Sequence, residues 1–281
     1  MTLFPPFEPD EPRLRRFRQF RAIPVRLLLP NLVTLLALCA GLTSIRMSID
    51  GRYEWAIAAI AIAALLDAVD GRVARFLKSS SRFGAELDSL TDFLNFGVAP
   101  GILIYVWALT DLRSVGWTAV LVFAICGALR LARFNVALDG PETPAWQGNF
   151  FVGVPAPAGA MTVMLPVYME LIGTPHGFWT APLVLVYTLA IGLLMVSRVP
   201  TWSGKLVGKR VPRDLVLPLF VVVVVLVAML LSYPWETMTV GTLLYLASLP
   251  LSWRSFERQA RGEGVPAVGE EPPPAKDGEA P

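Results

Sequence analysis

In one stretch of the sequence two apolar segments meet across a polar turn: LLDAVDGRVARFLKSSSRFGAELDSLTDFLNFGVAPG, residues 65–101. The turn near residues 78–86 predicts that one helix ends and a second begins, so that the two run antiparallel. Asp67 and Asp70 are three residues apart and share a face of the first helix, and Asp88 and Asp92, four apart, share a face of the second. Both pairs therefore fall at the same end of the hairpin, where they can converge.

Apolar segments flank this hairpin on both sides. Of the 281 residues, 54% are hydrophobic and only 16% are charged, whereas charged residues make up roughly 25% of an ordinary soluble domain. A helix needs about 20 mainly apolar residues to cross the hydrocarbon core, and an open sheet would leave backbone polar groups unpaired in lipid. The sequence therefore predicts an all-α polytopic membrane protein. The eight predicted spans cover residues 28–48, 54–77, 88–109, 115–134, 151–172, 178–196, 214–232 and 237–253.

The basic residues are distributed unevenly between the predicted loops. If the N-terminus is cytoplasmic, every lysine and arginine except Arg46, Arg52 and Arg113 lies on the cytoplasmic side. This distribution follows the positive-inside rule and supports an even number of spans. The protein is therefore expected to be integral to the inner cell membrane, with both termini and the four aspartates on the cytoplasmic side.

The segments outside the spans have their own composition. Residues 1–12 are rich in proline and acidic residues, and residues 254–281 end in GEEPPPAKDGEAP, so both are predicted to be disordered. Residues 13–27 mix apolar and basic side chains, which suits either an interfacial helix on an anionic leaflet or positive charge that only sets topology. Residues 28–200 form the predicted catalytic core, and residues 201–253 form a basic loop and the final pair of spans.

Several classes of function are excluded by composition. A formal net charge of +2 is too small to predict a nucleic-acid partner. Cys39 and Cys126 lie inside apolar runs, which argues against a disulfide framework or a cysteine metal site. The single histidine, His176, falls in a predicted outer loop far from the aspartates, and this excludes a Ser-His-Asp mechanism.

The four aspartates form a candidate metal site. Ionisable groups at membrane depth are costly and are usually functional. Four carboxylates cannot all stay ionised at close range without cations, and ligands that are all oxygen favour Mg²⁺ or Mn²⁺ over Zn²⁺. Such a set can bridge two ions about 3.5–4 Å apart. The alternative is a structural network in which the aspartates neutralise Arg72, Arg75 and Arg82.

Residues next to the aspartates suit a phosphate ligand. Gly71 lets the backbone approach a ligand closely, and the small side chain of Ala74, about one turn further, leaves space on the same face of the helix. Arg75 can reach a phosphate with its forked guanidinium group. Gly84 permits a tight entry into the second helix of the hairpin.

Together these residues meet the pattern D-x2-D-G-x2-A-R-x8-G-x3-D-x3-D without a departure. The pattern is the signature of the CDP-alcohol phosphatidyltransferases, which the chain therefore resembles. The resemblance covers roughly residues 28–200 and implies a six-helix core, extended here by two C-terminal spans, and a homodimer. Four segments are similar to the integral-membrane phosphatidylserine synthase branch of the family: PNLVTLLALCAGLTSI (30–45), DSLTDFLNFGVAP (88–100), CGALRLARFN (126–135) and FVGVPAPAGA (151–160).

The resemblance implies a reaction in which the phosphatidyl group of CDP-diacylglycerol passes to the hydroxyl group of L-serine, giving phosphatidylserine and CMP. It implies that Asp67, Asp70 and Asp88 bind two divalent ions, and that Asp92 helps to hold the second ion and acts as the general base. Gly71 and Arg75 are implied to contact the nucleotide and its diphosphate. The remaining residues of the implied nucleotide site are Ala74, Gly84, Ser81, Asn31 and Thr34.

The acceptor site is the harder part to predict. Free serine is a zwitterion, so its carboxylate needs a cation or hydrogen-bond donors and its ammonium group needs acceptors. Candidates are Arg130, Arg133 and Asn135 at the cytoplasmic end of the fourth span, and Asn95 one turn beyond the base. Alternatively, the two arginines only extend to the membrane interface. The aspartates do not distinguish serine from inositol phosphate, glycerol phosphate or choline, and a cation-coupled transporter is an alternative of another class.

Overall fold

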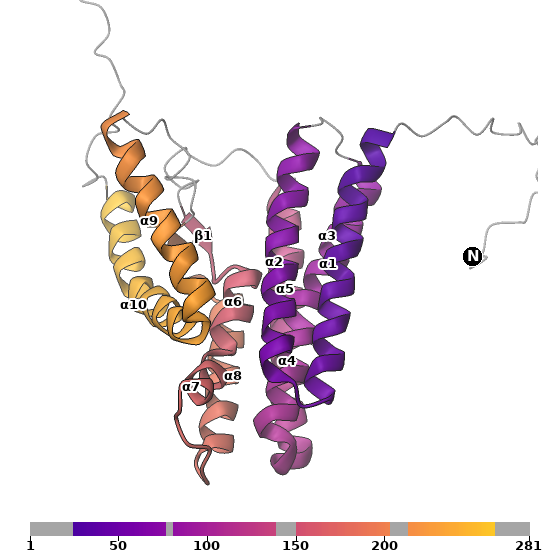
Figure 1. Ribbon diagram of the computed structural model, residues 1–281, viewed down its shortest axis with the longest axis vertical. Coiled ribbons are helices and arrows are strands. Elements are labelled where there is room, and N and C mark those ends of the chain that lie inside the picture. The colour runs from indigo at the N-terminus through magenta and orange to yellow at the C-terminus, as the bar shows by residue number, and fades with distance from the viewer. Residues whose placement is uncertain (1–24, 77–80, 139–149, 203–212, 262–281) are drawn as a thin grey trace, which may run out of the picture.

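The computed structural model describes residues 25–76, 81–138, 150–202 and 213–261, and these are almost entirely helical (Figure 1). The predicted all-α class is therefore confirmed in its main feature. The helices are α1 (Val25–Ile49), α2 (Tyr53–Phe76), α3 (Arg82–Asp92), α4 (Ala99–Ile104), α5 (Arg113–Leu138), α6 (Ala156–Val163), α7 (Leu165–Leu171), α8 (Thr180–Val196), α9 (Arg213–Ser232) and α10 (Pro234–Ala260).

Helices α1 and α2 form a close antiparallel hairpin. The chain turns at Gly51, whose φ of +73° suits glycine, and α1 then packs along α2 more extensively than any other pair of elements. Small buried side chains such as Ala37, Ser44 and Ala63 allow the two backbones to approach closely. This packing fixes the position, along the length of the hairpin, of the aspartates near the C-terminal end of α2.

The helix that follows begins earlier than predicted. The sequence predicts a turn near residues 78–86 and a span from residue 88, but α3 begins at Arg82. Ser81 is its N-cap, and the Ser81 hydroxyl accepts a hydrogen bond of 3.0 Å from the backbone N–H of Gly84. Beyond α3 the helical path continues through the π-helical segment η1 (Phe93–Val98), α4, the π-helical segment η2 (Tyr105–Leu109) and the short 3₁₀ segment η3 (Thr110–Leu112).

The chain reverses at Arg113, whose φ is 48°, and α5 returns alongside this helical path. A Cβ atom on Gly127 of α5 would lie 3.4 Å from the Cα atom of Gly97 in η1. Nearer the other end, the side-chain amide of Asn135 donates a hydrogen bond of 2.9 Å to the Ser89 hydroxyl of α3. These contacts align α5 antiparallel to α3 and η1, so residues near 131 lie level with residues near 93.

The predicted fifth span, residues 151–172, is wrong in detail. Its first residues belong to strand β1 (Phe150–Val152), which pairs antiparallel with β2 (Pro200–Trp202) after α8. The helix starts only at Ala156, after Pro155, and is interrupted at Met164 between α6 and α7. Proline lacks a backbone N–H and tolerates only the first turn of a helix, which explains both the late start at Pro155 and the restart near Pro166.

Two continuous helical stretches of the described residues are long and apolar enough to cross a membrane. They are Leu29–Ile49 and Arg82–Ala137, a stretch of 56 residues that includes the reversal at Arg113, while Thr180–Val196 and Val216–Ser232 are apolar but shorter. These helices fit a membrane protein. The predicted count of eight spans is not confirmed by them, because α2 carries the charged residues of the site and the α6–α7 segment is broken.

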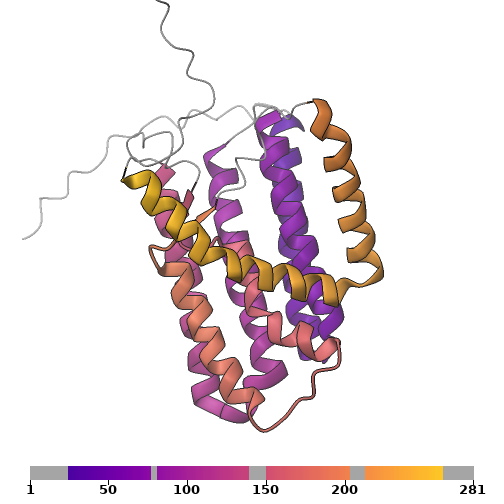
Figure 2. The ribbon, with the colours of Figure 1, turned by 90° about the vertical axis from the view of Figure 1, so that its left-hand side faces the viewer.

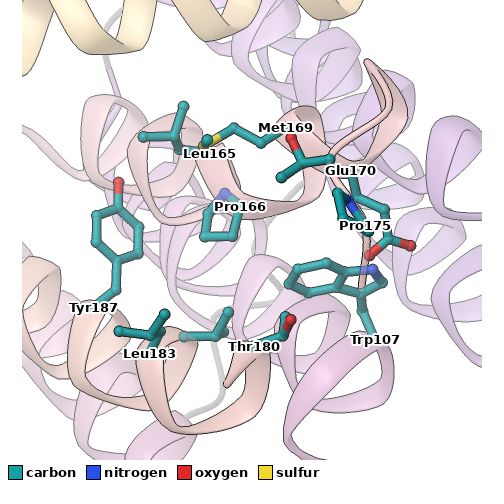
Figure 3. A pocket seen from close by; sticks show the side chains of 11 residues that line it. Trp107, Leu165, Pro166, Met169, Glu170, Pro175, Thr180, Leu183 and Tyr187 are labelled. Carbon is teal, nitrogen blue, oxygen red and sulfur yellow. The ribbon is translucent and has the colours of Figure 1, made fainter. Parts of the chain in front are cut away.

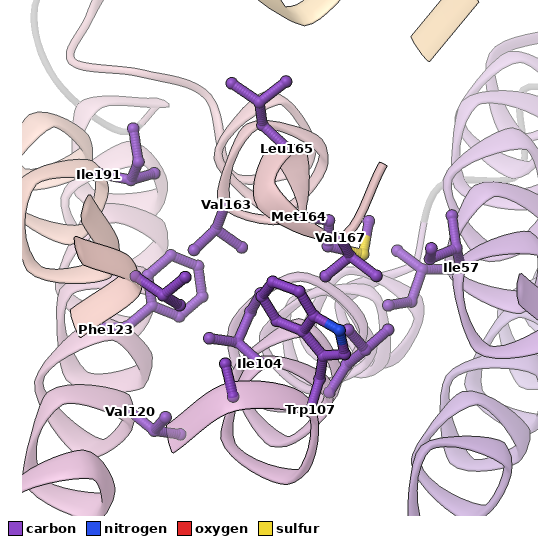
Figure 4. Packing of buried hydrophobic residues seen from close by; sticks show 14 of the residues in the cluster. Ile57, Ile104, Trp107, Val120, Phe123, Val163, Met164, Leu165, Val167 and Ile191 are labelled. Carbon is purple, nitrogen blue, oxygen red and sulfur yellow. The ribbon is translucent and has the colours of Figure 1, made fainter. Parts of the chain in front are cut away.

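Much of the hydrophobic core lies toward the end of the bundle remote from the four aspartates, but it extends to Val154 and Met195 beside the two arginines of α5. Its buried members come from the first turns of α2, from α4 and η2, from α5 and from α6 to α8, and they meet around Ile104, Trp107 and Phe123 (Figure 4). A smaller cluster of Phe96, Ala156 and Ala160 packs nearer the aspartates. The elements that carry the polar site are therefore anchored from one side by a continuous apolar core.

The C-terminal helices differ from each other in their packing. Along α9 the side chains of residues 216–232 are exposed, whereas α10 buries Thr239, Thr242, Leu249 and Ser252 against the rest of the molecule. Figure 2 shows α10 crossing the bundle obliquely, in yellow and orange. Since α10 extends to Ala260, the first residues of the predicted disordered tail are helical. The predicted segments 1–12 and 262–281, and most of 13–27, lie outside the described residues.

Candidate active site

The last turns of α2 and the middle of α3 bring three carboxyl groups together. Asp67, Asp70 and Asp88 each offer an oxygen atom, and these three atoms all lie within 4.8 Å of one another. Asp70 is buried, with 5% of its surface exposed, and the other two are half-buried. The convergence predicted from the spacing of the aspartates is thus found in the structure.

Asp92 lies one helical turn beyond Asp88 and completes the group. Its carboxyl group interacts directly with that of Asp67, and its Oδ1 atom is buried without a hydrogen-bond partner among the described residues. A buried, unpartnered carboxylate oxygen is costly unless a cation or a donor reaches it. The donor chemistry of the cluster, oxygen atoms only, fits a hard divalent cation.

The structural alternative for the aspartates, neutralisation by arginine, finds no support in the described part of the chain. None of Arg72, Arg75 and Arg82 forms an ion pair with any of the four aspartates there. The Nε atom of Arg75 instead donates to the carbonyl oxygen of Gly71, at 3.0 Å. The negative charge of the cluster therefore remains uncompensated by the protein side chains described.

Helix α1 contributes residues that approach the cluster. The Thr34 hydroxyl lies 2.9 Å from Asp70 Oδ2 and 3.1 Å from the carbonyl oxygen of Pro30, and it can donate to either. A Cβ atom on Gly84 would lie 2.8 Å from Asn31 Oδ1, so the glycine lets the start of α3 approach α1. Asn31, Thr34, Ser81 and Gly84 are thus gathered around one end of the aspartate cluster.

The end of α2 is open to its surroundings. Gly71 is exposed, and a Cβ atom built on it would meet no atom within 4 Å. Arg75 is exposed beside it, so both residues are accessible to a ligand that lies on the aspartates. Ala74 belongs to the same helix, but its side chain lies outside the described part of the structure.

Asn95 lies in the π-helical segment η1, one turn past Asp92. Its side chain is fully buried, and neither amide atom has a hydrogen-bond partner among the described residues. Gly41 of α1 makes room for it, because a Cβ atom at position 41 would overlap Asn95 Oδ1. π-Helical turns occur frequently at functional sites, and here one places an unsatisfied amide next to the predicted base.

The predicted acceptor arginines of α5 lie level with the aspartates but have partners of their own. The Nε atom of Arg130 donates to the carbonyl oxygen of Val154 at 3.1 Å. The guanidinium group of Arg133 donates to Val196 at 2.8 Å and to Ser197 at 3.1 Å, at the end of α8, and to Val152 in β1 at 3.2 Å. Arg133 therefore ties β1 to the end of α8, while Asn135 bonds to Ser89 of α3.

Gly153 and Gly41 are residues of this region that the sequence did not single out for their contacts. Gly153 has a φ of +80°, and a Cβ atom there would lie 2.5 Å from the carbonyl oxygen of Met195 and 3.0 Å from the Arg133 guanidinium group. The chain can thus pass between Arg133 and α8 only at a glycine. A glycine in an apolar or turn-forming stretch has many uses, so neither position carried a specific signal.

An apolar pocket lies elsewhere. It has a volume of about 340 Å³ and is lined by residues such as Trp107, Leu183 and Tyr187, at the end of the bundle opposite the aspartates (Figure 3). Glu170 at its edge is paired with His176 at 2.7 Å. Its described lining is mainly apolar and contains none of the four aspartates.

The chain is similar to several known proteins. The CDP-diacylglycerol–serine O-phosphatidyltransferase of Mycobacterium leprae is 41% identical over 226 residues, which are 80% of this chain and 74% of the relative. The Helicobacter pylori (strain 26695) protein of the same name is 32% identical over 80% of this chain and 91% of its own length. The archaetidylserine synthase of Methanothermobacter thermautotrophicus is 36% identical over 61% of this chain and 68% of its own length.

Two family models match the chain in succession. The model described as CDP-alcohol phosphatidyltransferase matches residues 27–194, which include all four aspartates and the two α5 arginines. A second, described as CDP-alcohol phosphatidyltransferase 2, matches residues 214–250, the C-terminal pair of helices. With the motif intact, its carboxyl groups gathered and more than half of the chain matched, the protein belongs to the CDP-alcohol phosphatidyltransferase family.

Proposed function

We propose that the protein transfers the phosphatidyl group of CDP-diacylglycerol to the hydroxyl group of L-serine, giving phosphatidylserine and CMP. The observation that carries the proposal is the cluster of four carboxyl groups, uncompensated by arginine among the described residues, in a chain of this family. The serine acceptor is supported by the names of the relatives reported above.

Asp67, Asp70 and Asp88, with Asp92 beside them, would hold two divalent ions, Mg²⁺ or Mn²⁺. When bound, the ions supply positive charge that offsets the charge of the diphosphate and of the leaving phosphate. Gly71 and Arg75, at the open end of α2, are placed to contact the nucleotide and diphosphate. Ala74, Gly84, Ser81, Asn31 and Thr34 complete the proposed nucleotide site.

The chain's own residues then perform the transfer. Asp92 takes the proton from the serine hydroxyl group, and its unpartnered Oδ1 atom is free to do so. The serine oxygen forms a bond to the lipid-side phosphorus, and the bond from that phosphorus to the oxygen of CMP breaks. CMP leaves with the electron pair of the broken bond, and the new phosphodiester remains attached to the diacylglycerol.

On the acceptor side, Asn95 and Arg130 have buried polar groups that suit the zwitterion of serine. Asn95 offers both a donor and an acceptor, and Arg130 offers a cation that is 6% exposed. Arg133 and Asn135 contribute by holding β1, α8 and α3 in place through the hydrogen bonds described above. In this proposal the four residues, from η1 and α5, contribute to the serine site from different sides.

The membrane arrangement is part of the proposal. Eight helical segments span the inner cell membrane, with the aspartates at the cytoplasmic end of α2 and α3 and both termini cytoplasmic. The positive-inside distribution supports this orientation, because only Arg46, Arg52 and Arg113 then lie outside. The enzyme acts as a homodimer in the lipid bilayer, as the family resemblance implies.

The test of the proposed function is an acceptor panel. Protein purified in detergent is supplied with CDP-diacylglycerol and Mg²⁺ or Mn²⁺, and CMP release is followed with L-serine, inositol phosphate, glycerol 3-phosphate or choline. Metal-dependent release with L-serine alone is expected. Release with a different alcohol would keep the phosphatidyltransfer and reject serine. Absence of release with every acceptor, from folded protein, would reject phosphatidyltransfer and reopen both alternatives for the aspartates, a structural network and a cation-coupled transporter.

A further inference from the structure

Helix α10 reaches the acceptor side of the proposed site, although it lies beyond the first family match. It packs against β2 and α7, and the Phe256 ring meets the edge of the Phe150 ring of β1, with ring centres 5.3 Å apart. Leu249 and Ser252 are buried in the same contact region. The last helix therefore packs against the β1–β2 pair, close in the chain to Val154, the backbone partner of Arg130.

Arg130 is an unusual cation in this region of the molecule. Only 6% of its surface is exposed, its Nε donates to the Val154 carbonyl, and its guanidinium group lies over the Phe134 ring at 5.4 Å. Among residues 25–76, 81–138, 150–202 and 213–261, no carboxylate forms an ion pair with it. A buried cation without an anion is strongly unfavourable, so the site favours an anionic ligand.

Tyr245 of α10 is a polar residue close to this cation. It packs against the core cluster that contains Val154, whose carbonyl oxygen accepts the hydrogen bond from Arg130, and it is near enough to Arg130 for electrostatic interaction. Its hydroxyl is buried without a hydrogen-bond partner in the described part of the chain. Tyr245 also lines a cavity of about 250 Å³ between α6, α7 and α10, with Thr162 and Thr242. A phenol oxygen accepts hydrogen bonds from guanidinium N–H groups, which makes the two side chains natural partners.

We propose that Tyr245 is a positioning residue for the acceptor, whose hydroxyl orients the Arg130 guanidinium group toward the carboxylate of the incoming amino acid. The inference rests on the proposed function, because it requires an acceptor that carries a carboxylate. The proposal assigns the C-terminal pair of helices a role in acceptor selection, a step that the aspartate motif alone does not explain.

The first test is the Tyr245→Phe variant, which removes only the hydroxyl group. In the CMP-release assay we expect its KM for L-serine to rise about tenfold, which corresponds to about 1.4 kcal/mol, while its KM for CDP-diacylglycerol stays within about twofold. Tyr233→Phe is the matched control, because Tyr233 is exposed at the start of α10. A thermal unfolding measurement on both variants identifies a general loss of stability.

A double variant separates positioning from a purely structural effect. If Tyr245 acts through Arg130, then Tyr245→Phe combined with Arg130→Lys should raise the L-serine KM no further than Arg130→Lys alone, whereas independent residues give additive effects. Additive effects, equal rises in both KM values, or an unchanged L-serine KM in Tyr245→Phe would each overturn the inference. Wild-type protein that releases CMP only with an alcohol lacking a carboxylate would instead overturn the proposed function as well.

Discussion

The Thr34 hydroxyl offers a direct way to test how the aspartate cluster is held. Thr34 is 5% exposed and its hydroxyl lies 2.9 Å from Asp70 Oδ2, so Thr34→Val removes this hydrogen bond with little change of volume. A hydrogen bond to a charged group contributes about 1.5–3 kcal/mol. We take the lower end, because the same hydroxyl also reaches the Pro30 carbonyl oxygen, and this corresponds to about a tenfold loss of metal affinity.

The assay is CMP release measured as a function of Mg²⁺ or Mn²⁺ concentration. We expect the half-saturating metal concentration to rise about tenfold in Thr34→Val, and turnover at saturating metal to return close to the wild-type value. The control is Thr43→Val on the same helix, since the Thr43 hydroxyl bonds only to the carbonyl oxygen of Cys39 in the described structure. That variant should titrate like the wild type.

Two results would refute this reasoning. An unchanged metal titration would show that Thr34 does not orient Asp70. A rise confined to the KM for CDP-diacylglycerol would favour the role in the nucleotide site that the family resemblance implies for Thr34.

Three further predictions concern the same site. Asp92→Asn should retain CDP-diacylglycerol binding but lose turnover by at least about 100-fold, and near-wild-type rates in the CMP-release assay would exclude Asp92 as the base. Chelation with EDTA should abolish CMP release, and added Mg²⁺ or Mn²⁺ should restore it; activity that survives chelation would contradict the metal proposal. Gly41→Ala should destabilise the protein by about 1–3 kcal/mol, because the new Cβ atom overlaps Asn95 Oδ1; an unchanged unfolding temperature would mean that Asn95 can move away.

The aspartate site could be predicted from the sequence because charged residues stand out in an apolar chain. The spacing of Asp67 and Asp70, and of Asp88 and Asp92, fixed one helix face each, and the turn between them fixed their common end. This prediction did not require knowledge of the residues that contact the aspartates in the fold. The structure then brought three of the four carboxyl groups within 4.8 Å, which the helical periodicity alone does not determine.

The β1–β2 pair and the contacts of Arg133 could not be predicted in the same way. Three-residue strands separated by about 50 positions carry almost no periodic signal, and residues 150–152 are as apolar as the spans around them. The partners of Arg133 are backbone carbonyl oxygens, which every residue possesses. Tyr245 escaped notice for a related reason, since one tyrosine in an apolar helix does not reveal which cation it faces.

The separation of the hydrophobic core from the aspartate end has a consequence for protein engineering. Most of the buried cluster around Ile104, Trp107 and Phe123 lies away from Asn95 and Arg130, although Val154 joins it to the Arg130 side chain. Substitutions of the Asn95 and Arg130 side chains therefore leave most of this stabilising packing untouched. A library confined to these two positions can search for enzymes that attach new alcohols to a phospholipid without removing the core packing that holds the helices together.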